Sequence, residues 1–260
     1  ELSSNTCYYQ VNPDKEFLNF KTAELIAEEY FNSNFIVFKT GNDPDKLINK
    51  IPALVKERLL NSGYLGQADG FRTIIYDFDR EGTEGLSRVL SVDKENVILI
   101  SSIDEGNLSV ALSNINNFAD QYPITLIGFN RYQQFKSINI EFFHNLKLHY
   151  ISPYWVDYAD KSTISFFQKF RDYFHTEPDN FGIQGYDVTI YFLTALKNYG
   201  KDFRECVPYM NLNLIQGKYK FEQISRFGGF MNTGVSVIQY KPDYDVVRKR
   251  FMGQNKIVQR

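Results

Sequence analysis

Small hydroxyl and amide side chains stand where several predicted strands end. Thr40 and Asn42 follow one apolar run, Ser101 and Ser102 close a second, and Asn130 follows a third. Loops at the carboxyl ends of parallel strands form the crevice in which open α/β sheets bind ligands. By position, Ser101, Ser102 and Asn130 could donate hydrogen bonds to a small polar ligand. Alternatively, these side chains hydrogen-bond the backbone of their own turns, as serine and asparagine commonly do.

No nucleophile, base or metal-ligand pattern stands at a spacing that supports catalysis. The chain contains no GxSxG, P-loop, HExxH or GxGxxG motif. Its three histidines lack a paired carboxylate pattern, so surface or strand positions explain them better than a general base. Four carboxylates crowd residues 77–84, but their spacing is not that of a calcium-binding loop. We therefore predict that the protein is not an enzyme and has neither a metal site nor a cofactor.

Helical and strand periodicities alternate along the first 150 residues as a parallel sheet requires. Strands are predicted at 35–38, 72–78, 96–101, 124–128 and 148–152, and helices at 16–31, 44–63, 83–90 and 107–122. This rhythm predicts an α/β fold, a three-layer α/β/α sandwich around a mainly parallel sheet.

Two of these helices carry specific expectations. The first should have an apolar stripe that includes Phe20 beside a charged face that includes Glu24. The second should be capped by Asp43, with Pro44 at its first position and its end near Gly63.

The second half of the chain has a different character. Amphipathic helices are predicted at 161–176 and 186–199, and alternating apolar residues over 217–240 indicate an antiparallel β segment. We divide the chain into an α/β lobe at 16–150 and a second region at 151–260. The second region holds a crossover hinge, two helices and a β-rich tail.

Composition narrows the classes of partner. The 260 residues are 43% hydrophobic and carry a net charge of −2, so the chain offers no basic field for nucleic acid. No apolar run reaches the ~18 residues that a membrane helix needs, so we expect no membrane insertion. Cys7 and Cys206 could pair in an oxidising compartment or remain free thiols. The start at Glu1, without an initiator methionine or signal peptide, favours a mature or trimmed fragment.

The region 149–200 carries several short motifs in a particular order. Ser-Pro-Tyr at 152–154 follows a strand, an aromatic helix runs through 167–178, and Gly-Tyr-Asp at 185–187 opens an apolar helix that stops at Gly200. In this order and spacing the region resembles the crossover and returning helices of type I periplasmic binding proteins. These are the leucine/isoleucine/valine-binding class of ABC-transporter receptors.

The resemblance implies a non-enzymatic receptor for an amino acid or a similar polar metabolite, working with a membrane transporter. It also implies an extracytoplasmic location, in the periplasm or cell envelope. In such receptors the strand-end loops supply hydroxyls and backbone N–H groups to the ligand. Tyr154 and Trp155, in the hinge, could then stack on the ligand or close over it. Trp155 could equally serve core packing.

The resemblance is incomplete. Residues 16–148 match lobe two of the family and 154–207 match the returning helices of lobe one, whereas the front part of lobe one has no counterpart. The apolar faces of these helices cover a sheet in the family. Here they should pack on the tail's β segment or against a second copy, giving a homodimer.

Two other function classes stay open. The chain could be a degenerate member that no longer binds ligand and serves as an interaction or cell-envelope module, attached to peptidoglycan-binding lysin motifs in a longer precursor. It could also be the effector domain of a bacterial regulator, although it has no helix-turn-helix or basic arm. A concave pocket at the strand-end loops would favour ligand binding, and a groove filled by the chain's own aromatic residues would favour the module.

Overall fold

The computed structural model describes residues 2–62, 66 and 70–249. Their contacts form two compact units, which we treat separately. The larger unit comprises residues 16–151 and 237–249, and the smaller unit comprises residues 2–15 and 152–236.

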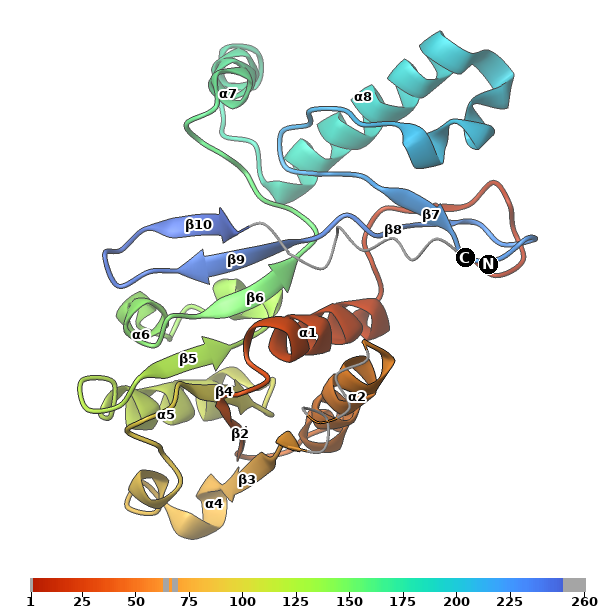
Figure 1. Ribbon diagram of the computed structural model, residues 1–260. Coiled ribbons are helices and arrows are strands. Elements are labelled where there is room, and N and C mark those ends of the chain that lie inside the picture. The colour runs from red at the N-terminus through yellow and green to blue at the C-terminus, as the bar shows by residue number, and fades with distance from the viewer. Residues whose placement is uncertain (1, 63–65, 67–69, 250–260) are drawn as a thin grey trace. The chain divides into compact units, whose positions relative to one another are not determined.

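The larger unit is a three-layer α/β/α sandwich, as predicted. Its sheet has the strand order β10-β9-β6-β5-β4-β2-β3, and neighbours from β6 to β3 run parallel. Helices α1 and α2 cover one face of this sheet, and α5 and α6 cover the other (Figure 1). The strands are β2 (Asn34–Lys39), β3 (Thr73–Asp77), β4 (Asn96–Ile100), β5 (Ile124–Ile127), β6 (His149–Ser152), β9 (Ser236–Tyr240) and β10 (Val246–Lys249). The helices are α1 (Lys15–Glu29), α2 (Leu47–Asn61), α4 (Phe78–Glu81), α5 (Glu105–Asn116) and α6 (Ile140–Asn145), with 3-10 turns η1 (Leu86–Arg88) and η2 (Asn130–Gln134).

The central strands are apolar on both faces because helices cover both sides of a parallel sheet. Every residue of β4 and of β5 is buried. The edge strand β3 is different: Ile75 is 51% exposed there. The predicted strands are thus confirmed, with ends shifted by at most one residue.

Three helix predictions in the larger unit need correction. In α1, Phe20 is 40% exposed and Glu24 is buried, because Lys21 and Arg58 pair with the Glu24 carboxylate at 2.6 and 2.9 Å. Helix α2 begins at Leu47, not at Pro44. The carboxylate of Asp43 nevertheless accepts the N–H groups of Leu47 and Ile48, at 2.8 and 3.0 Å. The predicted end at Gly63 lies outside the described residues.

Other element ends also moved. The predicted helix over 83–90 is only the 3-10 turn η1, and the one-turn helix α4 precedes it. Helix α5 starts two residues before the predicted 107, because Asp104 caps it by accepting the N–H of Asn107. It ends at Asn116 instead of 122.

The smaller unit joins helices to a three-stranded sheet of order β1-β8-β7. Its strands are β1 (Tyr9–Gln10), β7 (Phe221–Gln223) and β8 (Phe230–Asn232); its helices are α7 (Lys161–Phe174) and α8 (Asn180–Tyr199), followed by 3-10 turns η3 (Gly200–Glu205) and η4 (Val207–Tyr209). Helix α8 begins six residues before the predicted 186, because the side chain of Asp179 accepts the N–H of Gly182. The Gly-Tyr-Asp motif therefore lies inside the helix.

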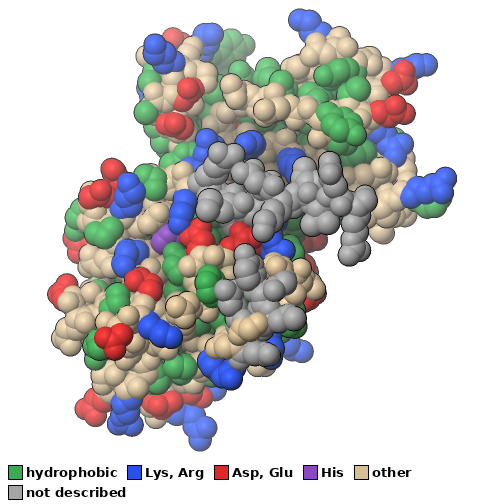
Figure 2. Space-filling view, in the orientation of Figure 1, with side chains coloured by type: hydrophobic (Ala, Val, Ile, Leu, Met, Phe, Trp, Pro, Cys, Tyr) green, Lys and Arg blue, Asp and Glu red, His purple; other side chains and the backbone are tan. Residues whose placement is uncertain are grey.

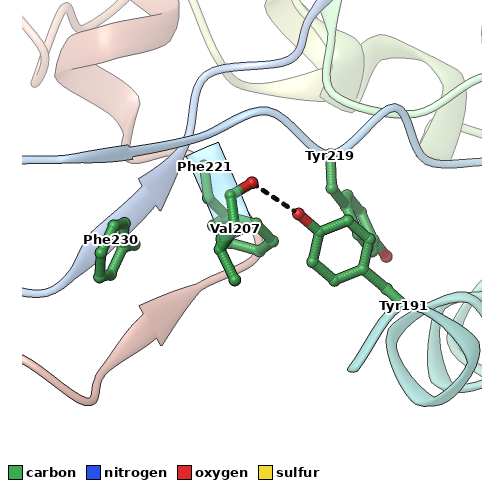
Figure 3. Packing of buried hydrophobic residues seen from close by; sticks show 5 residues of the cluster. All are labelled: Tyr191, Val207, Tyr219, Phe221 and Phe230. Atoms are coloured by element: carbon green, nitrogen blue, oxygen red, sulfur yellow. Dashed lines mark hydrogen bonds between the residues drawn. The ribbon is translucent and has the colours of Figure 1, made fainter. Parts of the chain in front are cut away.

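One face of α8 packs on the β-rich tail, which is one of the two arrangements expected from the sequence. Tyr191 lies against Tyr219 and Phe221, with Val207 and Phe230 in the same cluster (Figure 3). The hydroxyl of Tyr191 donates to the carbonyl of Val207 at 3.2 Å (Figure 3). The helix α7 packs through a second cluster of Phe166, Ile183 and Ile215.

The antiparallel tail is confirmed in kind but serves two sheets. Strands β7 and β8 form a hairpin in the smaller unit, closed by the turn at residues 224–229. Strands β9 and β10 pair antiparallel and extend the sheet of the larger unit. The sequence had suggested that these last strands belong to the second region. Whether the units are separate domains stays a prediction.

Candidate functional site

The strand order of the larger unit creates a reversal between β2 and β4. From β2 the chain crosses to β3 on one side, and then returns past β2 to β4 and β5 on the other. The loops after β2 and β4 therefore leave the sheet in opposite directions, and a crevice opens between them in folds of this type. Phe38 pairs with Ile100, and the N–H of Ser101 donates to the carbonyl of Phe38 at 3.0 Å. The two loops thus start side by side.

Three of the predicted site residues come together at this reversal. Thr40 is 3% exposed, and Ser101 and Ser102 are fully buried. The Ser102 hydroxyl accepts the N–H of Asp104 at 3.2 Å. The Ser101 Oγ is buried and makes no hydrogen bond within the part of the chain that the structure describes. A buried hydroxyl without a partner is uncommon, because leaving it unpaired costs free energy.

Asp79 also contacts the β2 loop at this reversal, and sequence reasoning assigned it no specific role. Its carboxylate accepts the Thr40 hydroxyl at 3.2 Å and the N–H of Gly41 at 2.9 Å. It reaches them from α4, the short helix after β3. Next to it, Lys39 donates to Asp77 at 2.5 Å and thereby holds the pKa of Asp77 below its ordinary value. Acidic residues in the 77–84 loop therefore organise the end of β2.

Gly41 sets how closely the β2 loop approaches α5. Its φ of +58° lies in the left-handed region, and a Cβ here would stand 2.1 Å from the Nδ2 of Asn107. Only glycine fits both requirements without displacing that side chain. The loop after β2 therefore lies against the first turn of α5.

Glu105, at the start of α5, organises the loop that follows β5. Its carboxylate accepts the N–H groups of Lys136 and Ser137 at 2.7 Å each, and the Ser137 hydroxyl at 2.8 Å. The bonds from Ser137 are the main reason that the pKa of Glu105 is lowered. Asn130, a predicted site residue, opens η2 in this loop and is half-buried. Asn42, another, is exposed in the β2 loop.

Tyr154 and Trp155 belong to the smaller unit, in the hinge segment at residues 152–155. The N–H of Trp155 donates to the carbonyl of Gln216 at 2.8 Å, and Tyr154 forms an isolated antiparallel bridge with Gly217. Both side chains are half-buried. The structure thus joins the hinge backbone to residues 216–217.

Asp187, from the Gly-Tyr-Asp motif, holds the same segment. Its buried carboxylate accepts the N–H groups of Ile215, Gln216 and Gly217 at 2.7, 2.8 and 2.9 Å. Burial raises the pKa of Asp187, and the three N–H donors act in the opposite direction. The role of the motif is therefore structural, because Asp187 fixes the segment to which the hinge is hydrogen-bonded.

A separate hollow of about 660 Å³ lies at the amino ends of the strands in the larger unit, lined by His149, Tyr30 and several charged residues. Four of these charges form two ion pairs, since Lys249 binds Glu29 at 2.5 Å and Lys147 binds Glu95 at 3.0 Å. Burial lowers the pKa of His149. Ion pairs within the larger unit therefore account for most of the charge in this hollow.

Within the described residues, no group of three or more histidine, cysteine, aspartate or glutamate side chains could hold a metal ion. None of the described helices is both long and apolar enough to cross a membrane. Cys7 and Cys206 are both free thiols.

No protein-family profile matches the sequence, and no curated protein matches it. Solved structures do match the fold. An ABC transporter substrate-binding protein from Desulfitobacterium hafniense in complex with Leu matches with a TM-score of 0.55 and 14% identity, over 92% of this chain and 66% of that one. A protein assigned to branched-chain amino acid ABC transport from Rhodospirillum rubrum matches with a TM-score of 0.59 and 11% identity, over 93% and 67%.

A third structure, from Silicibacter pomeroyi and assigned to the same transport class, matches with a TM-score of 0.52 and 10% identity, over 94% of this chain and 66% of that one. The chain thus spans about two thirds of the length of the solved proteins that it matches. Identities this low establish the fold alone. The chain has the type I periplasmic binding protein fold.

Proposed function

We propose that this chain is part of an extracytoplasmic, non-enzymatic receptor for an amino acid or a similar small polar metabolite. The proposed ligand surface lies at the β2/β4 reversal of the larger unit and includes Thr40, Asn42, Ser101, Ser102 and Asn130. Tyr154 and Trp155 of the hinge are proposed to stack on the ligand or close over it. The Leu complex of a protein with the same fold supports this class of ligand.

The observation that carries the proposal is the Ser101 hydroxyl. It is fully buried at the carboxyl end of β4 and has no partner among the described residues. A protein loses stability by burying such a group unless something else completes its hydrogen bonds. A ligand carboxylate or ammonium would do so, since a hydroxyl both donates and accepts.

The further partners are proposals of the same kind. A receptor of this fold would pass its ligand to a membrane transporter and would act in the periplasm or cell envelope. No nucleic acid is expected as a partner, because the net charge of −2 provides no attraction to phosphates.

The test is a thermal-shift and calorimetry panel of the amino acids, on the chain and on Ser101→Ala. A ligand that binds only the folded state raises the melting temperature. At a ligand concentration of 100 times Kd it adds about 2.7 kcal/mol to the free energy of unfolding. Ser101→Ala should leave the unliganded protein within about 0.5 kcal/mol, since no protein partner is lost. Ser101→Ala should also raise the Kd for the ligand about fivefold or more.

Ser113→Ala, which removes an exposed hydroxyl from α5, is the matched control and should leave both stability and affinity unchanged. If the unaltered chain and Ser101→Ala bound the ligand with equal affinity, Ser101 would not be a ligand-binding residue. Absence of any shift across the panel would contradict the receptor proposal.

A degenerate interaction or cell-envelope module is the second candidate, and Asp79 favours it. This carboxylate already occupies two donors of the β2 loop, the Thr40 hydroxyl and the Gly41 N–H. In that case the chain would be attached to peptidoglycan-binding lysin motifs in a longer precursor and would bind no small ligand. A negative amino-acid panel together with retention of the natural full-length protein on purified cell-wall fragments would support it.

A further inference from the structure

Helix α8 carries a second stripe of uncharged residues, on the side away from its buried face. The buried residues of α8 recur at every fourth position from Ile183 to Ala195 and pack inside the smaller unit. Tyr186, Thr189, Leu193 and Leu196 follow one another at spacings of three, four and three, which at about 3.6 residues per turn places them on the opposite side of the helix. Thr189 is exposed, and the other three residues are 42%, 57% and 47% exposed. We call these four residues the outer seam.

The outer seam has the spacing and the composition of a helix–helix contact. Residues that alternate at three and four positions line the contact between paired helices. A solvated helix face normally carries charges, but apart from the buried Asp187 the only charged residue of α8 is Lys197, near its end. Figure 2 shows hydrophobic side chains gathered at the upper right, where Figure 1 places α8. The outer seam is therefore typical of a surface that another helix covers.

The exposed apolar area of α8 is sufficient for a reversible dimer. Beside the outer seam, Phe181, Ile190 and Tyr199 are 80%, 37% and 44% exposed. With about 200 Å² for each large apolar side chain when fully exposed, these three and the large side chains of the outer seam present roughly 600 Å² on one copy. Two copies would bury roughly 1,200 Å², which is the lower limit for specific protein–protein interfaces. An interface of this size suits a Kd in the micromolar range.

We propose that α8 packs antiparallel against α8 of a second copy, along the outer seam and about a twofold axis. A twofold interface brings the same surface of both copies together, so a surface without charges meets no like charge. The outer seam is also symmetric about its midpoint. Antiparallel helices therefore place Tyr186 opposite Leu196 of the other copy, and Thr189 opposite Leu193 of the other copy.

Lys197 favours the antiparallel direction. In a parallel pair the two Lys197 side chains would meet, and their like charges would repel. In the antiparallel pair they lie at opposite ends of the contact, about 18 Å apart along the helix axis. That separation exceeds the ~8 Å over which charges interact strongly at physiological ionic strength.

Sedimentation equilibrium of the whole chain tests the proposal, from micromolar to near-millimolar concentration. We expect a monomer–dimer equilibrium with a micromolar Kd. Leu193→Arg should raise this Kd about tenfold or more, because each copy would bury an unpaired charge. Asn198→Arg adds the same charge to an exposed position of α8 away from the outer seam and should leave the Kd unchanged. Thermal melts followed by the fluorescence of Trp155 show whether both variants fold.

A mixing experiment tests the antiparallel register. Thr189→Glu by itself should weaken the dimer as Leu193→Arg does. An equimolar mixture of the two variants should restore it, because the antiparallel register places the two substituted positions opposite each other with opposite charges.

A chain that stays monomeric up to near-millimolar concentration would overturn the proposal and would assign the outer seam to a different polypeptide. A dimer with the same Kd in Leu193→Arg would also overturn it, as would a mixture of the two weakened variants that does not dimerise. The proposed amino-acid site lies in the other unit, so a failure here leaves that proposal untouched.

Discussion

Asp187 shows what a single buried carboxylate can organise. It has no exposed surface, and it replaces water with three backbone N–H donors from residues 215–217. The same residues hold the hinge through the Trp155 to Gln216 bond. Hydrogen bonds to a charged acceptor are about twice as strong as neutral ones, so this carboxylate should be the principal polar support of the smaller unit.

Asp187→Asn should therefore destabilise the smaller unit by roughly 2–3 kcal/mol, because the new NH₂ group would face an N–H donor and leave it unsatisfied. Urea unfolding, monitored by the fluorescence of Trp155, measures this change. Asp179→Asn, at the N-cap of the same helix, is the matched control. Asparagine caps a helix about as well as aspartate, so the unfolding midpoint of Asp179→Asn should equal that of the unaltered chain. Equal midpoints for both variants would contradict the role of Asp187.

His149 should make the stability of the larger unit depend on pH. The ring is 3% exposed, and burial lowers its pKa below the ordinary value of 6.5; the nearby Lys249 and Lys147 act in the same direction. The unfolded chain therefore binds a proton more readily than the folded one. The stability from neutral His149 is fully present above about pH 6.5 and is lost as the pH falls through the lower folded pKa.

Circular dichroism melts between about pH 5 and 8 check this expectation, with the unfolded pKa of histidine near 6.5 as the reference. His149→Gln removes the titrating group, and its stability should change less with pH over that range. His175→Gln, at an exposed helix end, is the control and should keep the pH dependence of the unaltered chain. If the stability of His149→Gln varied with pH as much as that of the unaltered chain, other titrating groups would be the cause of the pH dependence.

At the scale of the elements, the smaller unit depends on close backbone contact between residues 218–220 and 232–234. The Asn232 Oδ1 accepts the N–H groups of Lys220 and Gly234 at 2.9 Å each. A Cβ on Gly234 would lie 1.8 Å from the backbone oxygen of Lys218, which has no side-chain freedom to retreat. A side chain at this position would push the segments apart.

Gly234→Ala should therefore cost on the order of 2–4 kcal/mol in the unfolding free energy of the smaller unit, as overpacking against backbone does. Gly185→Ala offers a control with the same chemical change. Nothing lies within 4 Å of its added Cβ, and alanine in a helix is favoured over glycine by about 0.5–1 kcal/mol. The two variants should thus shift the Trp155 fluorescence midpoint in opposite directions.

At the scale of the whole molecule, the two units should unfold as separate transitions. Each has its own sheet and its own buried cluster. Trp155 is the single tryptophan of the chain and belongs to the smaller unit, so its fluorescence reports that unit alone. Far-UV circular dichroism reports both units, because α1, α2 and α5 lie in the larger one and α7 and α8 in the smaller one.

Asp187→Asn should then lower the fluorescence midpoint and leave in place the part of the dichroism transition that comes from the larger unit. His149→Gln should alter that part of the dichroism transition alone. Coincident midpoints by both probes in the unaltered chain and in both variants would show one cooperative body, and the division into two domains would be abandoned.

Much of the fold follows from local pattern. The apolar runs that became β2, β4 and β5 are buried on both faces, as their composition predicts. The loop residues Thr40, Ser101 and Ser102 were found by position, because the carboxyl ends of parallel strands share one edge. In the sequence Asp187 stood out only as part of a family motif. Its neighbouring residues do not indicate that its carboxylate accepts three hydrogen bonds from the N–H groups of residues 215–217.

Local sequence was enough to assign most helices and strands, since periodicity and helix caps depend on residues a few positions apart. Three facts became visible only in the folded chain: Glu24 is buried beside Arg58, Asp79 occupies the donors of the β2 loop, and β9 joins the larger sheet. These contacts join residues tens of positions apart, and they form only when strand order and helix packing bring their partners together. Long-range polar contacts therefore had to be observed, whereas the elements that carry them could be predicted.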